Sequence, residues 1–392
     1  MSQSVMIMSG VRTAIGTFGG ALASVPPTRL GSLVVAEALK RAQVEGAEVG
    51  TVVFGHVIVT EPRDAYLSRV AAMEGGIPKE VPAMNVNRLC GSGAQAVVSA
   101  AQAILLGDCD VAVAGGAECM SRSPHLLSTS RFGQRMGDMA ASDLMIGVLT
   151  DPFGHGGMGI TGENVAEKWN ITRAAQDELA LASQQRARAA IDEGRFHDQI
   201  LPVTVTVGRK ETVFDTDEHP KATTAEILAG LRAAFKKGGT VTAGNSSGIN
   251  DGAASLVLMA EDRAARSGKT PLARIVGYAH AGVEPGEMGI GPVPAVRKLC
   301  ERTGLKVSDF DVIESNEAFA AQACAVAREL DFDPAKLNPN GGAIALGHPV
   351  GATGAILVVK ALNELQRIGG RYGLITMCIG GGQGIALAIE RV

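Results

Sequence analysis

Short apolar runs alternate with stretches of helical periodicity along most of the chain. In the first third, this pattern predicts strands at 5–8, 52–54, 84–89 and 111–114, and helices at 28–43 and 94–106. Strands that alternate with helices in this way predict an α/β architecture.

The last third repeats the same order of elements. Its pattern predicts strands at 273–276, 312–313 and 374–377, and helices at 294–302 and 352–366. Cys90-Gly-Ser-Gly before one helix aligns with His348-Pro-Val-Gly before another. We therefore predict two duplicated halves of αβαβα type, packed about a pseudo-twofold axis that brings Cys90 close to His348.

The segment between the halves does not follow the repeat. Residues from about 120 to 250 form irregular stretches around one amphipathic helix at 173–193, with Thr172 as its N-cap and Gly194 at its end. An insertion of this size usually covers a ligand site or makes an oligomer contact. The predicted division is 1–270, which includes the inserted loop region, and 271–392.

Composition narrows the classes of function. The 392 residues are 46% hydrophobic and 19% charged, and the formal net charge of −4 argues against a nucleic-acid partner. No apolar run approaches the ~18 residues of a membrane span, and the N-terminus lacks the features of a signal peptide. The six cysteines form no C-x-x-C pair and have no zinc-ligand spacing. We expect a cytoplasmic protein with reduced thiols, no metal and no membrane contact.

Cys90 stands between a predicted strand and the glycine-rich start of a helix. The partial positive charge at a helix N-terminus favours a thiolate there, although a small buried cysteine at a tight turn is the simpler reading. The same stretch matches G-x-G-x-x-A, but Asp108 and Asp110 precede the next strand and do not end it, which argues against NAD. The run 380–384 lacks the Gly-Lys-Ser/Thr of a phosphate loop, so ATP is also not expected.

Three more positions carry chemical groups suited to work with a thiol. His348, held at a predicted helix start by Pro349, is a candidate base for Cys90 or else a surface N-cap. Cys378 ends an apolar strand before a glycine run whose N–H groups could form an oxyanion hole. Asn316 follows another strand, where it could orient a water or a carbonyl, or only form a turn.

Together these motifs resemble the signatures of thiolases. They are Asn87-Arg-Leu-Cys90-Gly-Ser-Gly, Asn316-Glu-Ala-Phe, Gly347-His348-Pro-Val-Gly and Cys378-Ile-Gly-Gly-Gly-Gln-Gly. The resemblance covers essentially the whole chain and is closest to the bacterial acetyl-CoA acetyltransferase and β-ketothiolase group. It implies an acyltransferase that joins two acetyl-CoA into acetoacetyl-CoA, or cleaves short 3-ketoacyl-CoA. Coenzyme A is then the substrate carrier, and no metal or redox cofactor is implied.

The resemblance also implies roles for individual residues. Cys90 would carry the acyl group as a thioester, His348 would deprotonate Cys90, and Cys378 would be the acid/base for the α-proton. Asn316, through a water, and His348 would form one oxyanion hole, and the N–H groups of Cys90 and Gly380 the other. The positions expected to contact coenzyme A or line the pocket are Ser247, Ala243, Lys221, Phe235, Met288, Phe319, Leu149 and Met158.

Two positions depart from the family pattern. Gly157 stands where relatives have a loop histidine facing the acyl-CoA, with His155 two residues earlier, which leaves the accepted acyl length open. Lys221 replaces an arginine and cannot form a bidentate fork with phosphate. The loop 123–142 resembles the tetramer-forming loop of the family and implies a homotetramer built as a dimer of dimers.

Three alternatives to a biosynthetic thiolase remain. One is a degradative 3-ketoacyl-CoA thiolase of broader chain length. A decarboxylating ketoacyl synthase of the same fold is disfavoured because such enzymes pair their cysteine with two His, or with His and Asn, and Cys378 stands in the third place here. A catalytically silent module that binds coenzyme A or lipid would be expected to lose a nucleophile or a base, and this chain keeps Cys90, Cys378 and His348.

Overall fold

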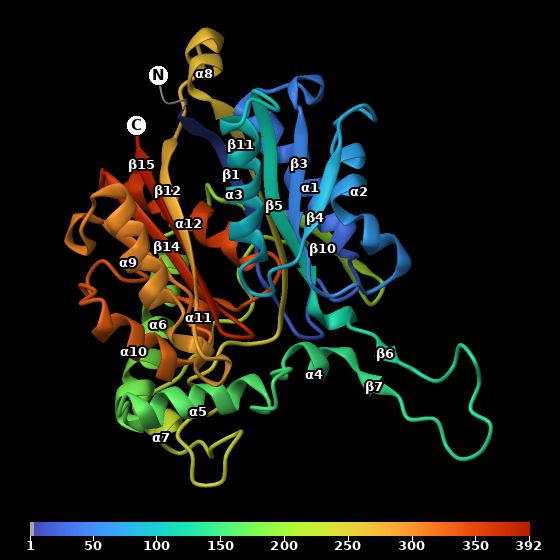
Figure 1. Ribbon diagram of the computed structural model, residues 1–392, viewed down its shortest axis with the longest axis vertical. Helices are drawn as coiled ribbons and strands as arrows, with labels where there is room; N and C mark the ends of the chain where they lie inside the picture. The colour runs from blue at the N-terminus through green and yellow to red at the C-terminus, as the bar shows by residue number, and fades with distance from the viewer. Residues whose placement is uncertain (1–3) are drawn as a thin grey trace.

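The centre of the molecule is one continuous mixed β-sheet, seen in the computed structural model of residues 4–392 (Figure 1). Across the sheet, the N-terminal half contributes β1 (Val5–Thr13), β11 (Asn250–Ala260), β5 (Val111–Cys119), β3 (Thr51–Gly55) and β4 (Ala83–Val86). The C-terminal half contributes β12 (Ala273–Gly282), β15 (Gln383–Arg391), β14 (Tyr372–Ile379) and β13 (Val312–Ser315). Residues 1–3, part of the segment in which no signal peptide is expected, lie outside the described residues.

The two halves repeat one pattern of strand pairing. In the N-terminal half, β1 pairs antiparallel with β11, β11 antiparallel with β5, and β5 parallel with β3. In the C-terminal half, β12 pairs antiparallel with β15, β15 antiparallel with β14, and β14 parallel with β13. The two first strands, β1 and β12, pair antiparallel with each other through Val5–Ile7 and Ala273–Ile275. A twofold relation between the halves requires this antiparallel meeting, so the predicted duplication is confirmed.

Four helices make the layers on either side of the sheet. α3 (Ser92–Leu105) packs on β3 and β5, α12 (Thr353–Ile368) packs on β13 and β14, and the two helices also contact each other. α1 (Pro27–Ala42) covers β1 and β11, and α9 (Pro292–Thr303) covers β12 and β15. Glycines let α3 and α12 approach, because a Cβ at Gly93 would lie 2.7 Å from the Ala355 nitrogen and one at Gly354 would lie 2.2 Å from the Ala94 nitrogen.

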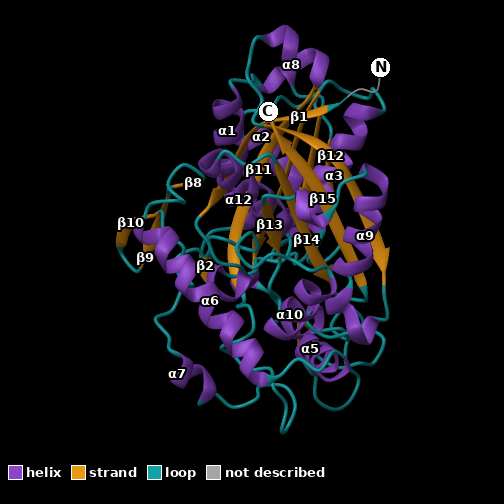
Figure 2. Ribbon diagram, turned by 90° about the vertical axis from the view of Figure 1, so that its left-hand side faces the viewer, coloured by secondary structure: helices purple, strands orange, loops and turns teal. Residues whose placement is uncertain are grey.

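The inserted segment adds an arm and a group of helices. The arm leaves through β6 (His125–Leu126), returns through β7 (Ser142–Asp143) and projects from the body (Figure 1). The helices gather at the end away from the chain termini (Figure 2): α5 (Met158–Lys168), α6 (Arg173–Asp192) and α7 (Ala225–Ala229) from this segment, together with α10 (Ala320–Glu329) from the C-terminal half. The Thr172 hydroxyl accepts a hydrogen bond from the Ala175 N–H, which confirms the predicted cap of α6.

The remaining elements are short. They are β2 (Gly16–Thr17), β8 (Ile200–Leu201), β9 (Val203–Val207), β10 (Lys210–Phe214), α2 (Leu67–Glu74), α4 (Leu144–Val148), α8 (Glu261–Ser267) and α11 (Ala343–Leu346). Over residues 4–392, no helix combines the length and the apolar character that crossing a bilayer requires. In the same range, no three His, Cys, Asp or Glu side chains are grouped as a metal would need.

Several sequence predictions differ from the structure. The strands expected at 5–8 and 273–276 run on to Thr13 and Gly282. The strand expected at 84–89 ends at Val86, because the following residues form the turn that presents Cys90. The strand expected to end at residue 114 runs on to Cys119 through Gly115 and Gly116. A Cβ at Gly116 would lie 2.3 Å from the Gly351 oxygen, so this glycine allows a close approach between the halves and does not end the strand. The strands β11 and β15 were not predicted.

Candidate active site

A tight, strained turn between β4 and α3 presents Cys90. Leu89, immediately before it, has φ of +46°, a left-handed conformation that a residue with a bulky side chain rarely adopts. The Ser92 hydroxyl holds the turn, because it accepts the Arg88 N–H at 2.8 Å and donates to the Leu89 carbonyl at 2.6 Å. The sequence motif predicted the turn, but not its strain or the role of Ser92.

Two backbone N–H groups lie near the sulfur of Cys90. They belong to Gly380 and to Cys90 itself, and both lower the pKa of the thiol. Burial has the larger effect and raises that pKa above its ordinary value. The expectation of a thiolate at the helix start is therefore wrong for the free protein. The resting side chain is a neutral thiol that needs a base.

Cys378 lies beside Cys90, one residue before the end of β14. Burial raises its pKa strongly, and the nearby Cys90 raises it further, since two negative sulfurs would repel each other. The next loop turns through Gly381 and Gly382, both with positive φ, and so brings the Gly380 N–H back to Cys90. The chain thus places the two thiols of the motifs together.

His348 is buried and not at the surface mouth that its motif suggested. Only 5% of it is exposed, and α12 begins five residues later, at Thr353. Burial lowers the pKa of His348 to about 4, so the imidazole is neutral near pH 7. A surface N-cap role is therefore wrong, and a neutral base remains.

The hydrogen bonds of the ring fix which nitrogen carries the proton. Nδ1 of His348 lies 2.6 Å from the Thr353 hydroxyl, which donates its own proton to the Pro349 carbonyl at 2.8 Å. Nδ1 must therefore be the donor to Thr353, and Nε2 keeps its lone pair. The main-chain N–H of His348 donates to Asn250 Oδ1 at 2.9 Å, which anchors the turn. The motifs named neither Thr353 nor Asn250.

Asn316 faces the free nitrogen of His348. Its Nδ2 lies 3.4 Å from His348 Nε2. Asn316 directly follows β13, and its main-chain N–H donates to the Thr376 carbonyl in β14. The other side-chain atom, Oδ1, is buried with no hydrogen-bond partner within residues 4–392. A buried acceptor of this kind calls for a donor, and a water or a bound substrate supplies one. This geometry excludes a simple turn-forming role for Asn316.

Apolar side chains surround both thiols. Cys90 packs against a cluster that includes Ile58, Met120, Met145, Val350 and Leu149. Cys378 belongs to a second cluster with Met288 and Phe319, against which Met158 packs. The Met158 N–H donates to the Leu149 carbonyl at 2.8 Å, which connects the two clusters. Four predicted pocket residues, Leu149, Met158, Met288 and Phe319, therefore belong to or pack against the two clusters that hold the thiols, and their contact with substrate stays a prediction.

The other predicted substrate positions lie farther out. The Phe235 ring meets Phe319 edge-on, with centroids 6.0 Å apart, and is partly exposed. The Ser247 N–H donates to the Ala318 carbonyl, which places Ser247 next to the Asn316 motif. Ala243 and Lys221 are exposed, and the Lys221 N–H donates to Gln184. Contact of these residues with coenzyme A stays a prediction.

The loop before α5 leaves room at Gly157, where the resemblance implied a histidine. A Cβ at Gly157 would have the Leu149 oxygen, 3.8 Å away, as its only neighbour within 4 Å in the described part of the chain. His155 does not fill this space, because its ring packs on Gly286 and its Nε2 lies 3.7 Å from Glu284. The substitution therefore leaves the site open here.

Comparison with known proteins identifies the family of the chain. Family models described as "Thiolase, N-terminal domain" and "Thiolase, C-terminal domain" match residues 5–262 and 269–391. The beta-ketothiolase BktB of Cupriavidus necator is 62% identical to this chain over 395 residues, covering 100% of each protein. An acetyl-CoA acetyltransferase of Thiocystis violacea is 49% identical, also over 100% of both.

Solved structures show the same fold. The Bacillus anthracis acetyl-CoA acetyltransferase matches with a TM-score of 0.98 at 50% identity, over 100% of this chain and 99% of that one. Human mitochondrial 3-ketoacyl-CoA thiolase matches with a TM-score of 0.97 at 43% identity, over the same shares. These findings confirm the resemblance, the predicted fold class and the predicted enzyme class. The chain belongs to the thiolase family of acyltransferases.

Proposed function

We propose that this chain joins two acetyl-CoA into acetoacetyl-CoA and coenzyme A, and runs the reverse thiolysis, through an acyl group on Cys90. The observation that carries the proposal is the set of resting protonation states. Two adjacent thiols keep their protons, while the buried imidazole of His348 is neutral with its lone pair on Nε2. This arrangement supplies one base and one acid before any substrate binds.

The first half-reaction moves the acyl group to the enzyme. His348 Nε2 takes the proton of Cys90, and the resulting thiolate attacks the thioester carbonyl of acetyl-CoA. The N–H groups of Cys90 and Gly380, which lie near the sulfur at rest, stabilise the oxyanion. The C–S bond then breaks, and the departing coenzyme A thiolate takes the proton of Cys378. The products are acetyl-Cys90, a Cys378 thiolate and a protonated His348.

The second half-reaction uses the Cys378 thiolate and the protonated His348. The Cys378 thiolate removes the α-proton of a second acetyl-CoA, and the burial that raises its pKa also makes it a strong base. The His348 Nε2–H and a water held by Asn316 Oδ1 stabilise the enolate oxygen. The enolate carbon attacks acetyl-Cys90 and releases acetoacetyl-CoA, and the Cys90 thiolate recovers its proton from His348. Cys378 ends the cycle protonated.

The decisive test is the coenzyme A-dependent loss of acetoacetyl-CoA absorbance with the purified protein. Steady-state kinetics on C4, C5 and C6 3-ketoacyl-CoA then distinguish a short-chain enzyme from a degradative thiolase of broader chain length. A folded protein that binds coenzyme A without turnover would make it a silent binding module and overturn the proposal. Activity only with malonyl thioesters would favour a decarboxylating synthase.

We propose a homotetramer, built as a dimer of dimers, in which the arm 123–142 makes the contact between dimers. The arm is almost entirely exposed and carries apolar side chains at its surface, with Phe132 96% and Met136 84% exposed. Exposed apolar side chains on a projecting loop are typical of an interaction site. Light scattering on a Phe132→Asp, Met136→Asp double variant should report dimers, and an unchanged mass would contradict this role.

We also propose the cytoplasm as the location, since all six cysteines are free thiols in the fold. Fluorescence of a labelled chain in the source cell would test the location directly.

We propose a boundary between the halves at 270/271, between α8 and β12. Coenzyme A enters as a substrate carrier, with no separate cofactor.

A further inference from the structure

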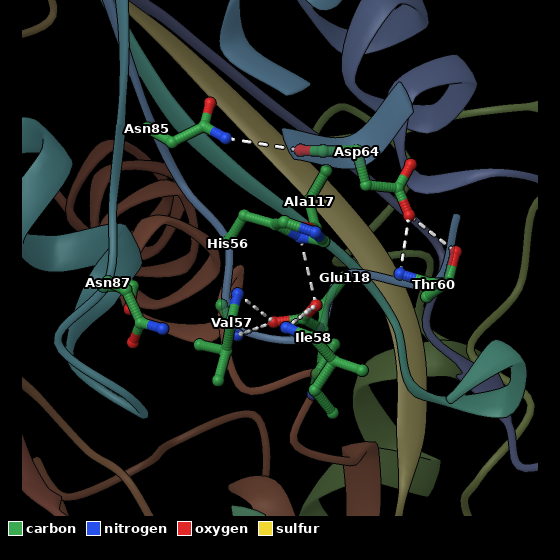
Figure 3. A network of polar contacts seen from close by, with 12 residues as sticks. His56, Val57, Ile58, Thr60, Asp64, Asn85, Asn87, Ala117 and Glu118 are labelled. Carbon is green, nitrogen blue, oxygen red and sulfur yellow. Dashed lines mark hydrogen bonds and ion pairs between the residues drawn. The ribbon is translucent and has the colours of Figure 1, made fainter. Parts of the chain in front are cut away.

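Glu118 is a fully buried carboxylate that bonds to both halves of the molecule. It lies in β5, and the close-up view shows it at the centre of a polar network (Figure 3). Oε1 accepts the Ile58 N–H at 3.1 Å and lies 3.1 Å from Nδ1 of His56. Oε2 accepts the Val57 N–H at 3.0 Å and the Gly351 N–H at 2.9 Å. Gly351 belongs to the other half and follows His348 by three residues.

The turn that contains Gly351 packs tightly against the N-terminal half. A Cβ at Gly351 would lie 2.4 Å from Glu118 Oε2, so only glycine fits there. The Gly351 carbonyl in turn presses on glycines of that half, since a Cβ at Gly55 would lie 2.5 Å from its oxygen and one at Gly116 would lie 2.3 Å from it. Glu118 therefore binds this turn at the point where the two halves are closest.

The same carboxylate holds residues of the apolar cluster against which the reactive thiol packs. Val57 and Ile58, whose N–H groups Glu118 binds, belong to the apolar cluster around Cys90. Val350, next to Gly351, belongs to that cluster as well. Glu118 thus connects the backbone of the His348 turn to the wall beside Cys90 through one side chain.

The ring of His56 contacts Glu118 from the N-terminal half. Its Nδ1 lies 3.0 Å from the Ala117 carbonyl as well as near Glu118, and both neighbours are acceptors, so Nδ1 carries a proton. Although burial alone would lower it, the carboxylate beside the ring raises the pKa of His56 above its ordinary value. The proposed reaction does not use either residue.

We propose that Glu118 is a positioning residue for acyl transfer, which fixes the distance between the His348 base and the Cys90 thiol by binding Gly351, Val57 and Ile58 at once. This inference rests on the proposed function, because it takes the roles of Cys90 and His348 from there. A small displacement of a base from its acid lowers a rate much more than it lowers binding. Loss of Glu118 bonds should therefore reduce kcat and leave KM nearly unchanged.

The test compares Glu118→Gln with a matched acid-to-amide change, Asp64→Asn. Each Glu118 oxygen accepts two donors, so an amide NH₂ in either place loses two bonds. Asp64 is equally buried, but all its hydrogen bonds go to one oxygen, Oδ2, and Oδ1 has no partner in the described chain. An asparagine keeps those bonds by turning its NH₂ to the Oδ1 side, so this variant should behave as the wild type.

We expect Glu118→Gln to lower kcat for acetoacetyl-CoA thiolysis by about tenfold to a hundredfold, with KM within about twofold. Iodoacetamide labelling of Cys90 at pH 7, followed by mass spectrometry, should slow by about tenfold or more, and Asp64→Asn should change neither. Wild-type kcat and labelling in a folded Glu118→Gln protein would overturn the inference. The labelling needs no CoA substrate, so it remains informative even if the wild type proves inactive and the proposed function fails.

A second pair of variants covers the case in which Glu118→Gln does not fold. His56→Leu removes the partner of the carboxylate and should lower kcat in the same direction. His56→Asn keeps a side-chain N–H near the Nδ1 position and should recover most of the rate. Equal rates for the two His56 variants and the wild type would show that the Glu118 network has no effect on the chemistry.

Discussion

Thr353 determines the tautomer of His348 across a hydrogen bond of 2.6 Å. The hydroxyl has already given its proton to the Pro349 carbonyl, so it can only accept from Nδ1. The lone pair of the imidazole is therefore on Nε2, the nitrogen that faces Asn316. A residue five positions beyond the histidine, outside the His-Pro-Val-Gly motif, thus prepares the base for the reaction.

Replacing Thr353 should weaken that preparation. Thr353→Val removes the hydroxyl with little change of volume and leaves Nδ1 of a buried ring without an acceptor. We expect kcat for acetoacetyl-CoA thiolysis to fall by about tenfold to a thousandfold, a loss on the order of 1–4 kcal/mol. Thr353→Ser keeps the hydroxyl and is the control. If valine and serine gave equal rates, the hydrogen bond would have no part in setting the tautomer.

The lowered pKa of His348 makes a prediction about stability. Its pKa is about 4 in the fold and ~6.5 in the unfolded chain, so between these values the unfolded state binds more protons. The free energy of unfolding should therefore fall as pH drops from ~6.5 towards 4, and His348 should add no pH dependence above that range. Urea unfolding of the wild type and His348→Gln at pH 7 and pH 5 measures this contribution. The wild type should lose about 2 kcal/mol more than the variant, and equal losses would contradict the burial argument.

Cys90→Ser should abolish thiolysis almost completely. A serine hydroxyl has a far higher pKa than even a buried thiol, so the neutral His348 cannot ionise it, and its ester is a poorer acyl donor. The variant should show no acetyl-enzyme by mass spectrometry and residual turnover at least about a thousandfold below the wild type. Wild-type-like turnover in this variant would exclude the covalent intermediate.

Cys378→Ser should separate the two half-reactions. The α-proton step should fail because a serine alkoxide is not available near pH 7, while acyl transfer to Cys90 should survive in part because His348 serves it. Mixing the variant with acetyl-CoA and measuring intact mass should reveal acetyl-enzyme without condensation. A folded variant with no acetyl-enzyme at all would give Cys378 a different role.

Iodoacetamide labelling tests the ranking of the thiols. Cys90 is partly accessible and in the proposed reaction gives its proton to His348, whereas Cys378 is fully buried. Cys90 should therefore react first among the six cysteines, and acetyl-CoA should protect it. If another partly exposed thiol such as Cys109 were labelled first, His348 would not activate Cys90.

The sequence predicted the thiols and the duplication because both depend on local patterns. Cys90 and His348 each precede a small-residue helix, and the equivalence of those helices places the two turns together. The pKa of Cys90 could not be predicted in this way, because it depends on how much protein surrounds the sulfur in three dimensions. The same limit applies to His348, whose burial likewise depends on the surrounding fold.

Thr353, Asn250 and Glu118 were missed for a related reason. Each acts through one hydrogen bond or a few to a distant part of the chain, and no spacing in the sequence marks such bonds. The strand β11 was missed because it begins where the inserted segment ends, and the pattern of that segment was interpreted as irregular. The strand β15 was missed because it follows the glycine run, which reads as a loop.

The open space at Gly157 leads to a prediction about acyl length. Gly157 has φ of −65° and ψ of 155°, a conformation that any residue adopts, so a histidine there should fold normally. Its ring would enter the space beside Leu149 and Met158, which lie next to the two thiols. Gly157→His should therefore hinder longer acyl chains more than short ones.

We expect Gly157→His to lower kcat/KM for C5 and C6 3-ketoacyl-CoA relative to acetoacetyl-CoA by about tenfold or more, since the loss of one methylene contact is worth ~1–3 kcal/mol. Both substrates must be measured on the same preparation. Gly157→Ala adds a Cβ without a ring and separates loop stiffening from occupation of the pocket. His155→Ala should leave the ratio unchanged, because that ring packs on Gly286. An unchanged ratio in a folded Gly157→His protein would move the limit on chain length to Met288 or Leu149.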